Sequence, residues 1–174
     1  MAVVLGDSLL RHLPDNPKFS KVFFPGIDSA ALSGKIVNGD LDNVLANASL
    51  IIILVGTNDI PCNLPRKVAI KVVSLGTLIQ ARFRGTCVAL AGILPRPEDE
   101  GLYSLAIKQT NKLIEQFCIG TTLVNLRCYR AFLSHNEPTL HHFSLDGLHL
   151  SEHGVTTLYR QLMSAIHRHT TGQL

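Results

Sequence analysis

Residues 50–59 read LIIILVGTND, and the first six of them decide the expected fold. Leu50 to Val55 is an unbroken apolar run, mostly β-branched, and Gly56 ends it. Continuous rather than alternating apolarity is typical of a strand that is buried on both faces, as in a parallel sheet. The polar residues 57–59 then fall at the carboxyl end of this strand.

Apolar runs and helix-patterned stretches alternate along the rest of the chain. Four further strands are predicted, at Ala2–Leu5, Lys21–Phe24, Thr86–Ala91 and Thr121–Leu126. Helical spacing of apolar residues predicts helices at Ala30–Ala46, Leu64–Phe83, Tyr103–Phe117 and from a Ser151 cap to about Arg168. Loops are expected at Leu94–Gly101 and Arg127–Leu148. This alternation predicts an α/β fold, a three-layer α/β/α sandwich around a five-stranded parallel sheet.

Length and composition favour one globular domain over residues 1–174. The chain is 46% hydrophobic and 17% charged, which is typical of a compact protein. Its formal net charge is only +3 and the basic residues are scattered, which argues against a strongly basic nucleic-acid-binding surface. Because the first predicted strand starts almost at Met1, we expect the domain to have been cut from a longer chain.

The spacing of the cysteines indicates the cellular compartment of the protein. None of the four, Cys62, Cys87, Cys118 and Cys128, has C-x-x-C spacing. We therefore expect reduced thiols and an intracellular, cytoplasmic location. No apolar run is long enough to span a bilayer, although a membrane surface stays open as a partner.

Small and polar residues follow the predicted strands. Residues 6–8 (Gly-Asp-Ser) follow the first, Gly26 the second and residues 56–59 (Gly-Thr-Asn-Asp) the third, while residues 146–149 (Asp-Gly-Leu-His) precede the last helix. Each is plausible turn chemistry by itself. Parallel strands bring their carboxyl ends to one edge, where sites gather. Together these residues can supply the nucleophile, base, orienting acid and oxyanion donors of acyl transfer.

Four blocks carry a family resemblance: "VVLGDSLL", "FFPGID", "LVGTNDI" and "SLDGLHLSEHG", in this order. With them the sequence resembles the SGNH (GDSL-type) hydrolase superfamily of esterases and acyl hydrolases. The resemblance implies a flavodoxin-like sandwich with no metal and no organic cofactor. It also implies Ser8 as nucleophile, His149 as base and Asp146 as its orienter. The implied oxyanion hole is the N–H of Ser8, the N–H of Gly26 and the Asn58 amide.

A narrower resemblance concerns "GDSLLRHL", "VGTNDI" and "LDGLHLSEHG". These are similar to the esterase modules in the first open-reading-frame protein of some animal LINE-type retrotransposons. Other small intracellular esterases of the superfamily are the alternative origin. We expect a small acyl-ester or lipid substrate, with nucleic acid bound only through other parts of a longer parent protein. The alternative is a non-catalytic SGNH-fold module that binds lipid or nucleic acid. The complete catalytic set favours turnover, and the sequence does not indicate the oligomeric state.

A metal site is the competing interpretation of the last block. The spacing His149-x-x-x-His153 could suit a metal ion. The adjacent Asp146 and the absence of a HExxH pattern favour the catalytic role for His149 instead, so no metal site is predicted.

Four other polar residues lie in or near the blocks without an assigned role. Asp7 and Asp59 could each orient backbone at the site, although the mechanism requires neither. His141 and His142 are predicted to lie in a solvated loop.

The same loop bears on substrate size. It contains "HNEPTLHHF", which is polar except for Leu140 and Phe143. A deep acyl tunnel needs bulky apolar walls, so we predict a shallow cleft that prefers short acyl esters. Leu140 and Phe143 are the residues that could form an apolar landing patch for longer lipids.

Overall fold

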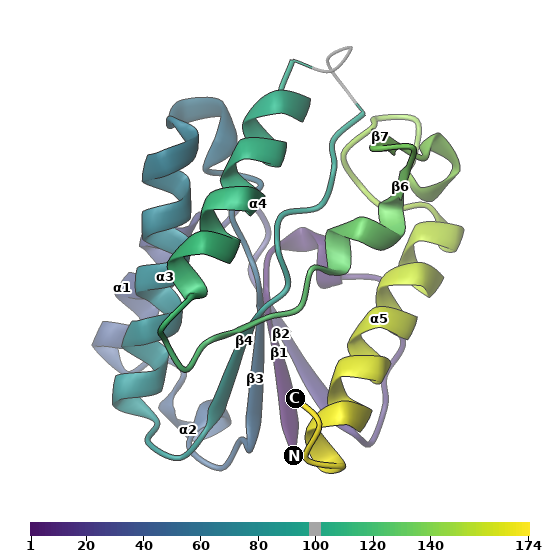
Figure 1. Cartoon of the computed structure of the whole chain (residues 1–174). Helices are drawn as coiled ribbons and strands as arrows, with labels where there is room; N and C mark the ends of the chain where they lie inside the picture. Colours follow the sequence, from purple (N-terminus) through teal and green to yellow (C-terminus); the bar gives the residue numbers. More distant parts are fainter. Residues whose placement is uncertain (98–101) are drawn as a thin grey trace.

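The computed structural model describes residues 1–97 and 102–174 (Figure 1). Its strands are β1 (Ala2–Gly6), β2 (Phe19–Phe23), β3 (Leu50–Leu54), β4 (Cys87–Leu90) and β5 (Val124–Asn125). They pair in parallel in the order β2-β1-β3-β4-β5, which confirms the predicted five-stranded parallel sheet. The second strand begins two residues earlier than predicted, and the fifth is shorter than predicted.

Helices cover both faces of this sheet (Figure 1). One face carries α1 (Ser29–Asn38), α3 (Pro65–Arg82) and α4 (Ser104–Cys118), and the other carries α5 (Glu152–Thr170). Each face has its own apolar cluster. Successive β3 residues alternate between them: Ile51 and Ile53 belong to one cluster, and Ile52 to the other. Burial on both faces is therefore the reason for the unbroken apolar run in this strand.

The helix predicted at Ala30–Ala46 is in fact two helices. α1 ends at Asn38 because Gly39 takes a left-handed conformation, with φ of 80°, and donates its N–H to the Ile36 carbonyl. A left-handed glycine is a common helix terminator. The short helix α2 (Asp42–Leu45) follows.

The segment Arg127–Leu148 is more ordered than predicted. It contains the 3₁₀ turn η4 (Cys128–Phe132), a two-stranded hairpin of β6 (Leu133–Ser134) and β7 (Glu137–Pro138), and the 3₁₀ turn η5 (Leu140–His142). The hairpin turn is His135-Asn136, both with positive φ. Such turns usually contain glycine, so no residue pattern marked this one. The loop predicted at Leu94–Gly101 is described only as far as Pro97, and residues 98–101 lie outside the described residues.

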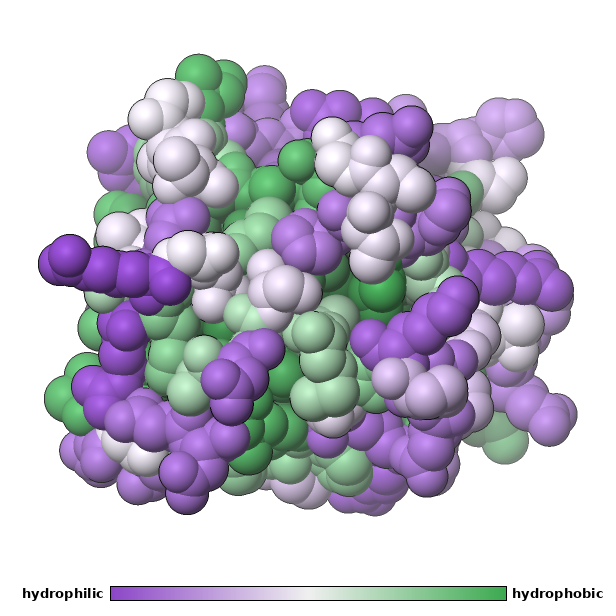
Figure 2. Space-filling view, turned by 90° about the horizontal axis from the view of Figure 1, so that it is seen from below, coloured by the Kyte–Doolittle hydropathy of each residue, from purple (hydrophilic) through white to green (hydrophobic). Residues whose placement is uncertain are grey.

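The amino-terminal edge of the sheet is seen from below in Figure 2. Apolar side chains gather over the middle of this face, with hydrophilic ones mostly around its rim. A hollow of about 380 Å³ here is lined by Met1, Ala2, Pro17, Lys18, Ser49, Met163, Ile166, His167, His169 and Thr170. It lies at the opposite end of β1 from Ser8, so it is separate from the predicted site.

Two further observations concern the thiols and the membrane. The four cysteines are all free of disulfides. Within the described ranges, no helix combines the length and the apolarity that crossing a bilayer requires.

Candidate active site

The predicted triad residues are hydrogen-bonded in series. The Ser8 Oγ lies 3.4 Å from Nε2 of His149, and Nδ1 of His149 lies 2.7 Å from Oδ2 of Asp146. Because the Asp146 carboxylate accepts from Nδ1–H, Nε2 keeps its lone pair and faces the hydroxyl. The order nucleophile, base and orienting acid is that of a hydrolytic triad. The Ser8–His149 contact is long for a hydrogen bond, as is common without substrate.

Asp146 is held in place by its own loop. Its Oδ1 accepts from the backbone N–H groups of Leu148, at 3.0 Å, and His149, at 2.9 Å. The hydrogen bond from the His149 side chain, followed by that from Leu148, lowers the pKa of Asp146 to about 2. The carboxylate is therefore ionised at any pH at which the imidazole can act as a base.

Ser8 is displayed at the end of β1 because the chain turns sharply there. Gly6 is required at this point, since a Cβ would lie 2.2 Å from the Leu54 carbonyl oxygen on the neighbouring strand. Ser8 then opens the 3₁₀ turn η1 (Ser8–Leu10), whose cap is Asp7. Oδ1 of Asp7 accepts the Leu9 N–H at 3.0 Å. The backbone of residues 6–9 therefore positions the hydroxyl.

Asp7 lies beneath the triad and is only 1% exposed. Its Oδ2 is buried and has no hydrogen-bond partner among the described residues. Burial raises the pKa of Asp7 to about 6, and the Leu9 N–H and the charge of His149 offset only part of this rise. Sequence reasoning placed Asp7 near the site, but its burial is visible only in the fold.

The three predicted oxyanion donors differ in their surroundings. In the described parts of the chain, the backbone N–H groups of Ser8 and Gly26 donate no hydrogen bond. Gly26 is exposed, with φ of 73°, and the space where a side chain would begin is open. Nδ2 of Asn58 donates to the Ile27 carbonyl at 2.9 Å. Since a primary amide carries two hydrogens, the second remains available to an oxyanion.

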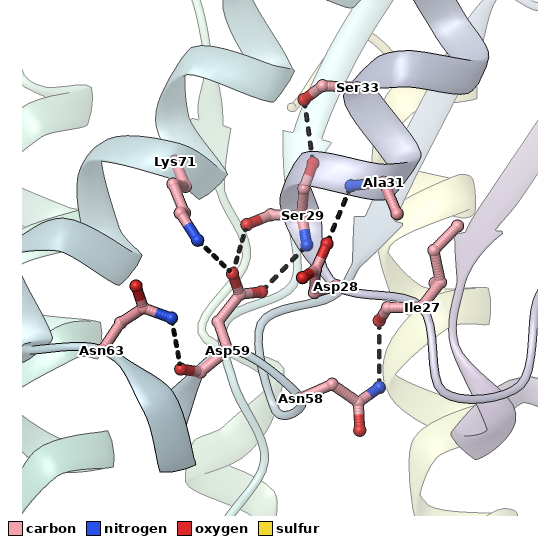
Figure 3. Close-up of polar contacts among 9 residues, drawn as sticks. All are labelled: Ile27, Asp28, Ser29, Ala31, Ser33, Asn58, Asp59, Asn63 and Lys71. Carbon is pink, nitrogen blue, oxygen red and sulfur yellow. Dashed lines mark hydrogen bonds and ion pairs between the residues drawn. The ribbon is translucent and has the colours of Figure 1, made fainter.

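Asp59 joins the two loops that carry these donors (Figure 3). Its side chain is fully buried and accepts from the backbone N–H of Ser29 at 2.9 Å and from its hydroxyl at 2.8 Å. Lys71 of α3 forms an ion pair with the same carboxylate at 3.3 Å. Asp59 directly follows Asn58 in the chain. Its contacts with Ser29 therefore hold the start of α1, shortly after the Gly26 turn, next to the loop that carries Asn58.

Sequence reasoning missed one residue of this loop system, Arg96. Its side chain is largely buried, and Nη1 donates to the Thr57 carbonyl at 3.0 Å. The guanidinium lies 5.0 Å from the ring centre of Tyr103. The available signal was an arginine inside the otherwise apolar stretch "GILPRP".

In the loop before the triad, the structure contradicts the expected solvation of His142 and rules out Phe143 as part of a landing patch. His142 is buried rather than solvated, and its ring lies 5.1 Å from that of Phe132. Burial, together with the neighbouring His141 and His153, lowers the pKa of His142. Phe143 is also buried, in the core against Phe132, so it cannot belong to an exposed landing patch. The rings pack inward because η5 lies directly on the first turn of α5.

Two of the predicted triad side chains are open to solvent. The side chain of His149 is 42% exposed and that of Asp146 is 51% exposed. Leu140 and Leu145 are exposed on the same loop. These exposures agree with a shallow site rather than with a closed tunnel.

No protein-family model and no curated protein matches this sequence. Solved structures do match. A lipolytic protein of the G-D-S-L family from Veillonella parvula is 15% identical with a TM-score of 0.79, over 96% of this chain and 98% of that chain. A GDSL-like lipase from Bacteroides thetaiotaomicron is 20% identical with a TM-score of 0.76, over 96% and 87%. A lipase/acylhydrolase from Enterococcus faecalis is 19% identical with a TM-score of 0.69, over 95% and 94%.

At these identities the likeness establishes the fold. The chain has the α/β fold of GDSL-type lipolytic proteins, as the sequence resemblance implied. The role of each residue depends on the geometry of the site itself.

Proposed function

We propose that this protein is a serine esterase that hydrolyses carboxylic esters through an acyl-enzyme intermediate. The observation that carries the proposal is the continuous hydrogen-bonded series from Ser8 through His149 to Asp146. A module that only binds lipid or nucleic acid has no need of a base aligned on a hydroxyl.

In the first half-reaction, Oγ of Ser8 attacks the ester carbonyl carbon while Nε2 of His149 takes the hydroxyl proton. The carbonyl oxygen becomes an oxyanion, which the N–H groups of Ser8 and Gly26 and the free amide hydrogen of Asn58 bind. The tetrahedral intermediate collapses, the bond to the alcohol breaks, and His149 protonates the leaving alcohol. Asp146 stabilises the imidazolium throughout.

In the second half-reaction, water replaces the alcohol. His149 takes a proton from the water, whose oxygen attacks the acyl carbon. Collapse of the second intermediate returns the proton to Ser8 and releases the carboxylic acid. These steps need no metal and no organic cofactor. The substrate proposed is a short acyl ester, because the side chains of His149 and Asp146 are open to solvent rather than enclosed by apolar walls.

Ser8→Ala tests the proposal in a chromogenic acetyl-ester assay. The variant is expected to lose turnover by a factor of at least about 10³ while keeping its circular dichroism spectrum. Ser134→Ala is the matched control, since Ser134 is exposed on the β6–β7 hairpin. Turnover by folded Ser8→Ala at the wild-type rate would overturn the mechanism. A wild-type protein that binds esters without turnover would favour the binding module.

The narrower similarity to retrotransposon esterase modules rests on sequence motifs alone and stays a prediction. The cytoplasmic location, inferred from the cysteines, also stays a prediction, as do the lipid substrate and the binding of nucleic acid through other parts of a longer parent protein.

A further inference from the structure

Three histidine side chains meet beside the catalytic loop, although the proposed mechanism uses none of them. His141 and His142 come from η5, and His153 comes from the first turn of α5. Their ring centres are 4.3 Å, 4.6 Å and 5.1 Å apart. One nitrogen from each ring can be chosen so that all three lie within 4.8 Å of one another.

The ring nitrogens of this cluster lack protein partners. Across the described residues, none of the three side chains makes a hydrogen bond or ion pair with another residue. Nδ1 of His142 is buried and unpaired, which is costly for a polar atom. The three imidazoles pack against one another, and His142 also packs against Phe132, so their ring nitrogens gather in one place. A ligand that accepts lone pairs would satisfy them together.

We propose that His141, His142 and His153 bind a divalent transition-metal ion, with zinc as the fitting ion. Zinc takes imidazole nitrogens at about 2.0–2.1 Å, which places tetrahedral ligands about 3.4 Å apart. The ring nitrogens lie within 4.8 Å of one another, so binding requires them to move closer by up to about 1.4 Å, and the exposed side chains of His141 and His153 are the ones that would move. Neutral imidazoles select zinc, copper or nickel over calcium and magnesium, which prefer oxygen ligands.

The surroundings supply access and a compensating charge. An open hollow of about 490 Å³ at the cluster is lined by His141, Ser151, Glu152, His153 and Thr156. The amino terminus of α5 disfavours a cation nearby, but Glu152 places a carboxylate in the same turn. Water can complete the tetrahedron. This set differs from the His149-x-x-x-His153 pair considered from the sequence, because His149 faces Ser8 and Asp146 instead.

A metal here would cross-link the base of the catalytic loop. Ser151 already joins α5 to η5, with its N–H donating to the His142 carbonyl at 3.0 Å and its hydroxyl to the His141 carbonyl at 2.6 Å. Ser144 joins the two ends of the loop: its N–H donates to the His149 carbonyl and its hydroxyl to the Leu150 carbonyl. The loop that carries Asp146 and His149 thus begins and ends at these contacts between η5 and α5. The metal would stabilise it without touching substrate.

Calorimetric titration of EDTA-stripped, dialysed protein with zinc chloride tests the proposal, with cobalt(II) absorption as a report on tetrahedral geometry. One zinc per chain is expected. His141→Gln and His153→Gln should each weaken the affinity at least tenfold. At about 100 times the Kd, zinc should raise the Tm of the wild type by about 5–10 °C.

Two control variants make the result specific. His12→Gln removes an exposed histidine elsewhere, and His149→Gln removes the catalytic base; both should keep the wild-type zinc affinity. Circular dichroism confirms that the variants are folded. The absence of stoichiometric binding would overturn the proposal, as would an affinity unchanged in His141→Gln and His153→Gln. Loss of binding in His149→Gln would move the site to the triad. The result does not depend on esterase activity.

Discussion

Asp59 provides the sharpest test of how this fold holds the loops of the proposed active site. The carboxylate is fully buried and receives three contacts: two from Ser29 and one from Lys71. The substitution Asp59→Ala removes all of them. It leaves the Ser29 N–H and hydroxyl without an acceptor and Lys71 without its counter-charge, in a position where its side chain is only 26% exposed.

The cost follows from these contacts. A hydrogen bond to a charged group contributes about 1.5–3 kcal/mol, so the two from Ser29 account for about 3 kcal/mol at the low end. The half-buried ion pair adds about 1 kcal/mol more, for a total of about 4 kcal/mol, within the range for breaking a buried pair. For a chain of this size the Tm should fall by about 8–16 °C. With an m-value of about 2 kcal/mol/M, the urea midpoint should fall by about 2 M.

Urea unfolding followed by circular dichroism measures this cost. Asp42→Ala is the matched control, because Asp42 forms an ion pair with Arg82 at the surface, where both side chains are at least one-third exposed. Surface pairs contribute little, so the control should move the midpoint only slightly. A midpoint for Asp59→Ala that falls no further than that of Asp42→Ala would refute the reasoning. In the folded variant, we also expect kcat to fall, because the two loops that carry the proposed oxyanion donors are then joined only by the hydrogen bond from Asn58 to the Ile27 carbonyl.

Other predictions concern catalysis and pH. Asn58→Ala should lower kcat by about 10²–10³, as for other oxyanion donors, and a twofold change or less would mean that Asn58 does not contact the oxyanion. For Asp7, the raised folded-state pKa of about 6 means that ionisation costs stability as pH rises from about 4 to 6. The stability of Asp7→Asn relative to the wild type should therefore increase by about 2.5 kcal/mol between pH 4 and pH 7 in urea unfolding, and a pH-independent difference would contradict this. Among p-nitrophenyl esters of two to sixteen carbons, kcat/KM should peak at or below about six, whereas a peak at twelve or beyond would reveal an apolar channel.

Local sequence patterns predicted most of the fold. The run at Leu50–Val55 and the helical periodicity between the strands depend only on which faces of an element are buried. The order of apolar and polar residues reveals those faces directly. The division of the predicted helix at Gly39 was harder to predict, since many helices tolerate an internal glycine. A glycine ends a helix only when its backbone adopts a left-handed conformation. The β6–β7 hairpin could not be predicted, because its His135-Asn136 turn lacks the glycine that usually marks such a turn.

By itself the sequence determined the five-stranded α/β fold and nominated Ser8, Asp146, His149, Gly26 and Asn58. These residues sit at the ends of predicted elements, where a parallel sheet gathers its loops, so topology alone implies that they converge. Only the tertiary structure decided the contacts between distant segments: the burial of Asp7, the link from Asp59 to Ser29 and Lys71, and the meeting of the three histidines. The physical reason is that burial and partner choice arise when separate loops pack together, and neighbours in sequence do not encode which loops those will be.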